Sequence, residues 1–315
     1  MASSLAFLFP GQGSQSVGML KALAAAWPVV GETYAEASDV LGYDLWHLVD
    51  EGPKSELDRT AVTQPAMLAA GVAVWRVWRS AGGPWPICVA GHSLGEYSAL
   101  VVAEAIDFRD AVALVAERAR AMQSAVPPGD GAMAAIIGLS DAEVVDLCAT
   151  QARGEVLEAV NFNAPGQVVI AGTKAAVDRA VVAAKPAGAK RALPLPVSVP
   201  SHCALMRPAA EALVGPLASI PVAAPRIPVL HNVTTAPESA PDRIRELLVR
   251  QLFSPVPWVG TMERLAKQES VTLAVECGPG KVLTGLSKRV EPAVPTLPVY
   301  DPDTLASALE VVNAA

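Results

Sequence analysis

The chain has 315 residues, of which 52% are hydrophobic and 17% are charged, so it is long and apolar enough to bury a large core. Its net charge is −7 and no long block of Lys and Arg occurs, which disfavours nucleic-acid binding. Pro, Gly or charged residues interrupt every apolar run before the roughly 18 residues of a spanning helix, so we expect no membrane insertion.

The first predicted strand covers residues 5–9 and ends at Pro10. No cationic region precedes it, so it does not resemble a secretion signal, and we expect a cytoplasmic protein. Further along, predicted strands alternate with Ala-rich helical stretches, which indicates an α/β body with a parallel sheet covered by helices. The later elements of this body are strands at 87–90, 271–275 and 296–300, and helices from 96 to 106, near 281–290 and after 302.

The middle of the chain, residues 129–197, has a different pattern and lies between a Pro-Gly-rich segment and a proline cluster. We interpret it as an inserted subdomain, with residues 1–128 and 198–315 forming the α/β body. The strand-helix-strand-strand-helix-strand order predicts a ferredoxin-like fold. The expected elements are strands 133–139, 156–162, 167–171 and 190–195, a helix 140–151 with a capping box, and a helix 173–185.

The four cysteines lie far apart, and no pair has a metal-ligand spacing. Neither a disulfide framework nor a structural zinc site is therefore supported, and we expect no metal. In a reducing compartment such cysteines are typically small buried hydrophobic residues.

The strongest local signal for chemistry is the G-x-S-x-G pattern at residues 91–95, with Ser93 at its centre. A short apolar strand comes directly before it and a helix directly after it, which is the context of a nucleophile elbow on an α/β-hydrolase-like body. Ser93 is therefore the candidate nucleophile. The alternative is an ordinary tight strand-to-helix connection in which the serine caps the helix.

A serine nucleophile needs a base, and the chain has only four histidines. His92 adjoins Ser93 and should point away from it. His47 lies in a helical segment, and His231 lies in a strand-like segment where a core histidine is common. His202 lies where the insertion returns to the main body, beside an expected cleft, so it is the first candidate for the base and His231 the second.

Arg118 lies on the apolar face of a predicted helix that begins after Asp107, whereas Arg109 and Arg120 lie on the opposite face. A buried guanidinium keeps its proton and needs an anionic partner, which is either a structural carboxylate or a ligand. The alternative is a side chain that extends along the apolar surface to reach solvent. If Ser93 is a nucleophile nearby, an acyl group that carries a carboxylate is the natural ligand.

The glycine-rich segment at residues 11–16 follows the first strand and invites a dinucleotide-binding interpretation. Ser16 stands at the third glycine position, however, and no acidic residue ends a strand at the expected distance. Nucleotide binding is therefore disfavoured. The loop is better placed to offer backbone N–H groups beside those that follow Ser93, as an oxyanion hole.

Several motifs are in register with those of a known family. They are G-Q-G-S-Q from residue 11, Q-P-A from 64, G-H-S-L-G-E-Y from 91, Arg118, N-F-N-A-P-G-Q from 161, P-S-H from 200 and E-C-G-P-G from 276. Together they cover nearly the whole chain, which resembles the malonyl-CoA:acyl carrier protein transacylases, a family of acyltransferases that carries such a ferredoxin-like insertion.

The resemblance implies transfer of a malonyl group from coenzyme A to the phosphopantetheine thiol of an acyl carrier protein, through an acyl-Ser93 intermediate. This reaction would serve fatty-acid synthesis, with polyketide synthesis left open. It implies His202 as the base, oriented by the main-chain carbonyl of Gln251, and no cofactor, because malonyl-CoA is a substrate. The substrate-binding residues that it implies are Arg118 for the malonyl carboxylate, the backbone N–H groups of Gln12 and Leu94, and Gln64 and Asn163.

The sequence departs from the family pattern at Glu104 and Ala119, where glycine is usual. A serine esterase or thioesterase that uses the same Ser93 and His202 stays an alternative and should place a triad acid beside His202. A nucleotide-binding module that depends on Gly11 and Gly13 is a second alternative. For docking of an acidic carrier, the candidate cations are Lys190 with Arg191, or Lys281 with Lys288 and Arg289.

Overall fold

The computed structural model describes residues 4–197, 199–290 and 292–314. Its centre is a five-stranded parallel sheet in the order β7-β2-β1-β8-β9. The strands are β1 (Leu5–Phe9), β2 (Cys88–Gly91), β7 (Val229–Leu230), β8 (Leu273–Cys277) and β9 (Thr296–Val299). The alternation of strands and helices correctly predicted this parallel sheet.

The β1 strand is buried along its whole length because helices cover both faces of the sheet. Leu5, Phe7 and Phe9 contact one hydrophobic cluster, which includes the long helices of the body. Ala6 and Leu8 point to the other face, where the second cluster includes Trp258 and Leu283. This two-sided burial explains why a parallel strand is a continuous apolar run and does not alternate with polar residues.

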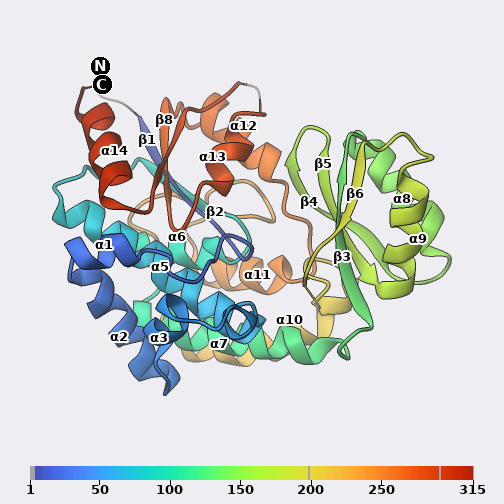
Figure 1. Ribbon diagram of the computed structural model, residues 1–315, viewed down its shortest axis with the longest axis horizontal. Helices are drawn as coiled ribbons and strands as arrows, with labels where there is room; N and C mark the ends of the chain where they lie inside the picture. Colours follow the sequence, from blue (N-terminus) through green and yellow to red (C-terminus); the bar gives the residue numbers. More distant parts are fainter. Residues whose placement is uncertain (1–3, 198, 291, 315) are drawn as a thin grey trace.

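The helices of the body surround this sheet (Figure 1). They are α1 (Lys21–Ala26), α2 (Val29–Leu41), α3 (Leu45–Asp50), α4 (Lys54–Leu57), α5 (Thr60–Ser80), α6 (Gly95–Val102), α7 (Phe108–Ala125), η1 (Ala204–Met206), α10 (Arg207–Ser219), α11 (Pro241–Gln251), α12 (Trp258–Lys267), α13 (Val282–Ser287) and α14 (Pro302–Ala314). Across the described ranges, no helix combines the length and the apolar character that crossing a bilayer requires.

The second sheet is antiparallel, with four strands in the order β4-β5-β3-β6. Its elements are β3 (Gly131–Ile137), α8 (Asp141–Ala152), β4 (Leu157–Ala164), β5 (Gln167–Thr173), α9 (Lys174–Ala184) and β6 (Arg191–Pro194). Their order is the predicted ferredoxin-like one, and the capping box of Ser140 and Glu143 at the start of α8 is confirmed. The division of the chain at residues 129 and 197 stays a prediction.

The two faces of the antiparallel sheet have different roles. Ile136, Val168 and Ile170 pack against α8 and α9, which cover the outer face in Figure 1. Met133 and Val169 lie on the inner face, which turns toward the parallel sheet. All four cysteines are buried and free, as expected of small hydrophobic residues.

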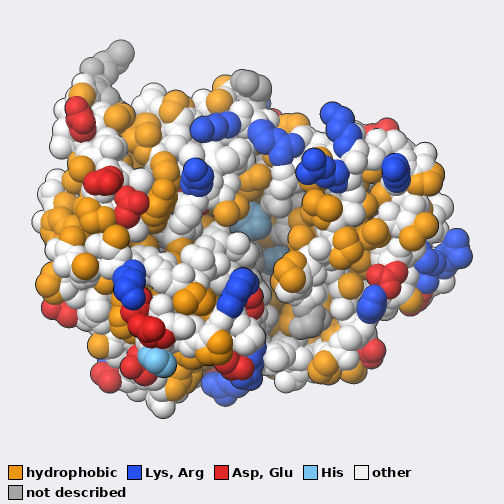
Figure 2. All heavy atoms as spheres, in the orientation of Figure 1, with side chains coloured by type: hydrophobic (Ala, Val, Ile, Leu, Met, Phe, Trp, Pro, Cys, Tyr) orange, Lys and Arg blue, Asp and Glu red, His pale blue; other side chains and the backbone are white. Residues whose placement is uncertain are grey.

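A cavity lies where the inner face of the antiparallel sheet meets the ends of the parallel strands. Both parts of the chain line it, with Ser93 and Arg118 from the body and Met133 and Val169 from the antiparallel sheet. Figure 2 shows the hollow between the two parts, with histidine side chains visible at its bottom. The carboxyl end of a parallel sheet is where α/β proteins commonly bind ligands.

Candidate active site

The G-x-S-x-G segment forms the tight strand-to-helix turn that its pattern predicts. Ser93 has a φ of +52°, a left-handed conformation that is uncommon for residues with a side chain. A Cβ on Gly91 would lie 1.9 Å from the carbonyl carbon of Gly95, and one on Gly95 would lie 2.0 Å from the backbone oxygen of Phe9. Both positions therefore require glycine, and the close packing that they permit holds Ser93 at the bend.

The Ser93 hydroxyl contacts the side chain of His202. Ser93 Oγ lies 2.7 Å from His202 Nε2, and His202 Nδ1 lies 2.8 Å from the backbone oxygen of Gln251. His202 is held by its own backbone as well, since its N–H donates to Leu252 O at 2.9 Å. The carbonyl oxygen accepts a hydrogen bond from Nδ1–H, which leaves the lone pair of Nε2 directed at the serine hydroxyl.

The environment of His202 keeps its imidazole neutral. Burial, and after it the positive charge of Arg118, together lower its pKa from the usual 6.5 to about 3. At neutral pH the Nε2 atom is therefore free to accept a proton. A serine hydroxyl beside such a nitrogen is the arrangement that nucleophilic catalysis requires.

Arg118 is 1% exposed and lies on the buried stripe of α7 that the sequence predicted. Its Nη1 donates to Gln64 Oε1 at 2.6 Å and its Nη2 donates to Gln251 Oε1 at 3.0 Å. Its guanidinium also lies 5.4 Å from the ring centre of Tyr97. Within the described ranges no carboxylate forms an ion pair with Arg118. Arg118 therefore neither pairs with a structural carboxylate nor extends to solvent, because neutral amides accept hydrogen bonds from its guanidinium inside the protein.

Two backbone N–H groups at the cavity have no partner. Gln12 and Leu94 both line it, and in the described part of the chain neither backbone N–H donates to a protein acceptor. The Gln12 loop lies close to the elbow, since a Cβ on Gly11 would lie 2.5 Å from the backbone oxygen of His92. This close approach, rather than phosphate binding, accounts for the glycine at position 11. The side chain of Gln12 donates to Thr60 Oγ1 at 3.3 Å.

The remaining histidines have other contacts. His92 points away from Ser93, as expected, and its Nε2 lies 2.8 Å from Asn163 Oδ1. Burial lowers the pKa of His92, so this ring is also neutral. Asn163 thus meets a histidine at the cavity wall. His47 lies in α3, in agreement with its prediction as a helix residue.

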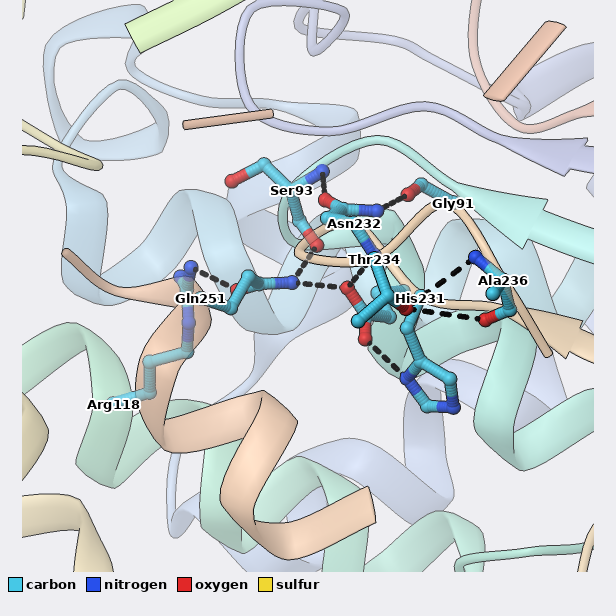
Figure 3. A network of polar contacts seen from close by, with 9 residues as sticks. Gly91, Ser93, Arg118, His231, Asn232, Thr234, Ala236 and Gln251 are labelled. Carbon is cyan, nitrogen blue, oxygen red and sulfur yellow. Dashed lines mark hydrogen bonds and ion pairs between the residues drawn. The ribbon is translucent and has the colours of Figure 1, made fainter. Parts of the chain in front are cut away.

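His231, the second candidate for the base, is fully buried and contacts a carboxylate instead of the serine. Its Nδ1 lies 2.7 Å from Glu96 Oε1. Figure 3 shows it at the far end of a polar network from Arg118. The Ser93 hydroxyl points away from this network, whereas its backbone N–H and carbonyl take part in it.

Sequence reasoning missed Glu96, Asn232 and the side chain of Gln251. Asn232 Oδ1 accepts from the N–H of Ser93 at 2.7 Å, and its Nδ2 donates to Gly91 O at 2.6 Å, so it joins the two sides of the elbow. A signal for Glu96 was present, because it is a carboxylate in the first turn of an otherwise apolar helix. No local pattern marked Asn232.

Glu104, one of the two departures from the family pattern, lies on the surface and pairs with Arg226 at 2.9 Å. Its φ is +58°, which is the physical reason for glycine at this position in other members. Its carboxylate therefore does not enter the cavity.

The chain is similar to proteins of a known family. The acyl transferase domain family matches residues 6–291. The malonyl CoA-acyl carrier protein transacylase of Escherichia coli (strain K12) is 57% identical over 309 residues, which are 98% of this chain and 100% of that protein.

Solved structures match as well. A type II PKS acyl-carrier protein in complex with its malonyl-transacylase gives a TM-score of 0.96 at 55% identity, covering 98% of this chain and 100% of the matched chain. An acyl carrier protein S-malonyltransferase from Vibrio cholerae O1 gives 0.94 at 56% identity, covering 97% and 100%. The chain therefore belongs to the acyl transferase domain family and, within it, to the malonyl CoA-acyl carrier protein transacylases that its motifs resemble.

Proposed function

We propose that the protein transfers a malonyl group from coenzyme A to the phosphopantetheine thiol of an acyl carrier protein, through an ester on Ser93. The observation that carries this proposal is one cavity that holds both a serine–imidazole contact of 2.7 Å and a buried arginine whose side-chain acceptors, among the described residues, are neutral amides. The first can form an acyl ester, and the second can bind the carboxylate at the other end of the acyl group.

In the first half of the reaction, Ser93 Oγ attacks the thioester carbonyl while His202 Nε2 takes its proton. The N–H groups of Gln12 and Leu94, which have no acceptor among the described residues, can stabilise the negative charge that develops on the carbonyl oxygen. Coenzyme A then leaves as a thiol with the proton from His202. The second half reverses these steps, with the carrier thiol attacking the acyl-serine. The residues named perform these steps without a cofactor.

The Gln251 carbonyl takes the place that a carboxylate has in a serine hydrolase triad. It contacts His202 Nδ1 at 2.8 Å and fixes the tautomer without adding a negative charge. The esterase alternative expected a triad acid here, so this contact supports transfer. Gln64 holds Arg118, and Asn163 lies at the cavity wall against His92, where both can contribute to substrate binding.

Basic side chains lie around the hollow in Figure 2 and suit an acidic carrier. Arg289 reaches across to the antiparallel sheet, where it donates to Gln167 and to Pro165 O. Lys288 adjoins it, so charge reversal at Lys288 should weaken carrier binding. Unchanged carrier affinity in Lys288→Glu would exclude this residue from docking.

Intact-mass measurement after brief exposure to malonyl-CoA tests the function. The parent protein should gain the mass of one malonyl group, and Ser93→Ala should gain none. Addition of carrier protein bearing phosphopantetheine should remove the label and move it to the carrier. Rapid release of free malonate without the carrier would instead identify a thioesterase.

A further inference from the structure

The buried carboxylate of Glu96 lies in the first turn of α6, just after the elbow. Its Oε1 accepts from His231 Nδ1 at 2.7 Å. Its Oε2 accepts from Asn232 N at 3.1 Å and from Gln251 Nε2 at 2.7 Å. Three N–H groups therefore converge on it, which is the environment of a buried negative charge.

The side-chain amide of Gln251 lies between this anion and the guanidinium of Arg118. Figure 3 shows Gln251 beside Arg118. Its Nε2 faces Glu96 and also donates to Ser93 O at 2.9 Å, while its Oε1 accepts from Arg118 at 3.0 Å. The opposite orientation would set the NH₂ group against the guanidinium and the oxygen against two other oxygens. Glu96, together with the Ser93 carbonyl, therefore favours the orientation in which the amide oxygen faces Arg118.

This arrangement offsets the positive charge of Arg118 without a direct contact between Glu96 and the guanidinium. A buried guanidinium with no anion nearby is costly, whereas a carboxylate in direct contact would compete with any carboxylate of the substrate. An interposed amide avoids both outcomes. It transmits part of the electrostatic field of Glu96 and leaves N–H groups of Arg118 for a ligand. Among the described residues only the Gln64 and Gln251 oxygens accept hydrogen bonds from the guanidinium, which otherwise lies against the Tyr97 ring.

We infer that Glu96 is a positioning residue for acyl selectivity, which sets through the Gln251 amide how strongly Arg118 holds the carboxylate of the acyl group. This inference rests on the proposed function. It predicts that the preference for malonyl over acetyl depends on where the negative charge stands relative to Arg118. The preference should fall when a carboxylate is moved into contact with the guanidinium, and rise when the buried charge is removed.

Two single variants test opposite signs. Gln64→Glu places a carboxylate directly on Arg118 and, unlike Gln251→Glu, sets no second carboxylate against Glu96, because the other end of the Gln64 side chain faces Met122 Sδ. The ratio of kcat/KM for malonyl-CoA to kcat/KM for acetyl-CoA should therefore fall about tenfold or more. Glu96→Gln keeps the shape and the acceptor for Asn232 and Gln251, while its NH₂ group can donate to the other tautomer of His231. With the opposing charge removed, the ratio should rise about 3- to 30-fold, from Coulomb's law at the effective dielectric of protein sites.

Glu276→Gln is a matched control. Glu276 is also fully buried and accepts from three donors, the N–H groups of Leu283 and Thr284 and the Thr284 hydroxyl. The Glu276→Gln substitution should lower the melting temperature and leave the malonyl-to-acetyl ratio unchanged. The ratio of kcat/KM for malonyl-CoA to kcat/KM for acetyl-CoA, measured on one sample, does not depend on the folded fraction. A general loss of stability therefore cannot produce the two opposite shifts.

An unchanged ratio in either test variant, a fall in Glu96→Gln, or an equal shift in Glu276→Gln would overturn the inference. If Glu96→Gln does not fold, Gln64→Glu decides alone, and an unchanged ratio there rejects the inference. Failure of the proposed function is a separate result, because the parent protein would then form no malonyl ester on Ser93.

Discussion

Replacement of Arg118 by alanine is the most direct test of acyl recognition. The guanidinium is buried and its only side-chain acceptors in the described residues are the amide oxygens of Gln64 and Gln251. A charge-assisted pair with a substrate carboxylate is worth about 1.5–3 kcal/mol, so its loss should lower kcat/KM for malonyl-CoA by roughly 10- to 150-fold. Acetyl-CoA has no carboxylate and should lose less.

The same substitution changes His202 in a known direction. Arg118 contributes to the lowered pKa of His202, so its removal moves that pKa back toward 6.5. The imidazole still stays mainly neutral at pH 8, where the base function should persist. Acetyl transfer at pH 8 therefore reports the intact serine–histidine pair.

The assay is release of coenzyme A from each thioester at pH 8, with Arg120→Ala as the control. Arg120 lies on the exposed face of the same helix and pairs with Glu117 at 2.9 Å, so its removal should leave the malonyl-to-acetyl ratio unchanged. Equal losses for the two thioesters in Arg118→Ala would refute the reasoning, because they would show that the guanidinium does not distinguish the acyl groups.

Four other predictions concern the base and the elbow. Because the pKa of His202 is lowered to about 3, acylation by acetyl-CoA should show no decline centred near pH 6.5, and stopped-time mass measurements from pH 5 to 8 would detect one. The unfolded state binds more protons between these two pKa values, so the free energy of unfolding should fall as pH drops below 6.5 and less so in His202→Ala. Gly95→Ala should abolish acylation, because the added Cβ would lie 2.0 Å from Phe9 O. The control Gly31→Ala, at an open position of α2, should keep full activity and raise the free energy of unfolding by about 0.5–1 kcal/mol. An active Gly95→Ala protein would contradict the packing of the elbow. Asn232→Ala leaves Gly91 O and Ser93 N without their side-chain partner. In urea unfolding this should cost about 1–3 kcal/mol for the buried Gly91 O and less for the part-buried Ser93 N, and wild-type stability would argue against a role of Asn232 in holding the elbow.

Local sequence patterns were sufficient wherever the structure depends on the nearest neighbours along the chain. The apolar run of residues 5–9 predicted β1, and the Ser140 capping box predicted the start of α8. The stripe on α7 predicted a buried Arg118, because helical periodicity fixes which side chains share a face. The two glycines around Ser93 predicted the sharp turn, because only glycine permits the contacts that the turn makes.

The tertiary structure alone decided what those residues meet. The sequence indicated that Arg118 needs a partner, but it gave no sign that two neutral amides would supply it, since Gln64 and Gln251 lie 54 and 133 residues away. Asn232 braces Ser93 across 139 residues, and Glu96 reaches Gln251 across 155. Hydrogen bonds over such separations follow no periodicity, because the packing of several strands and helices brings these partners together.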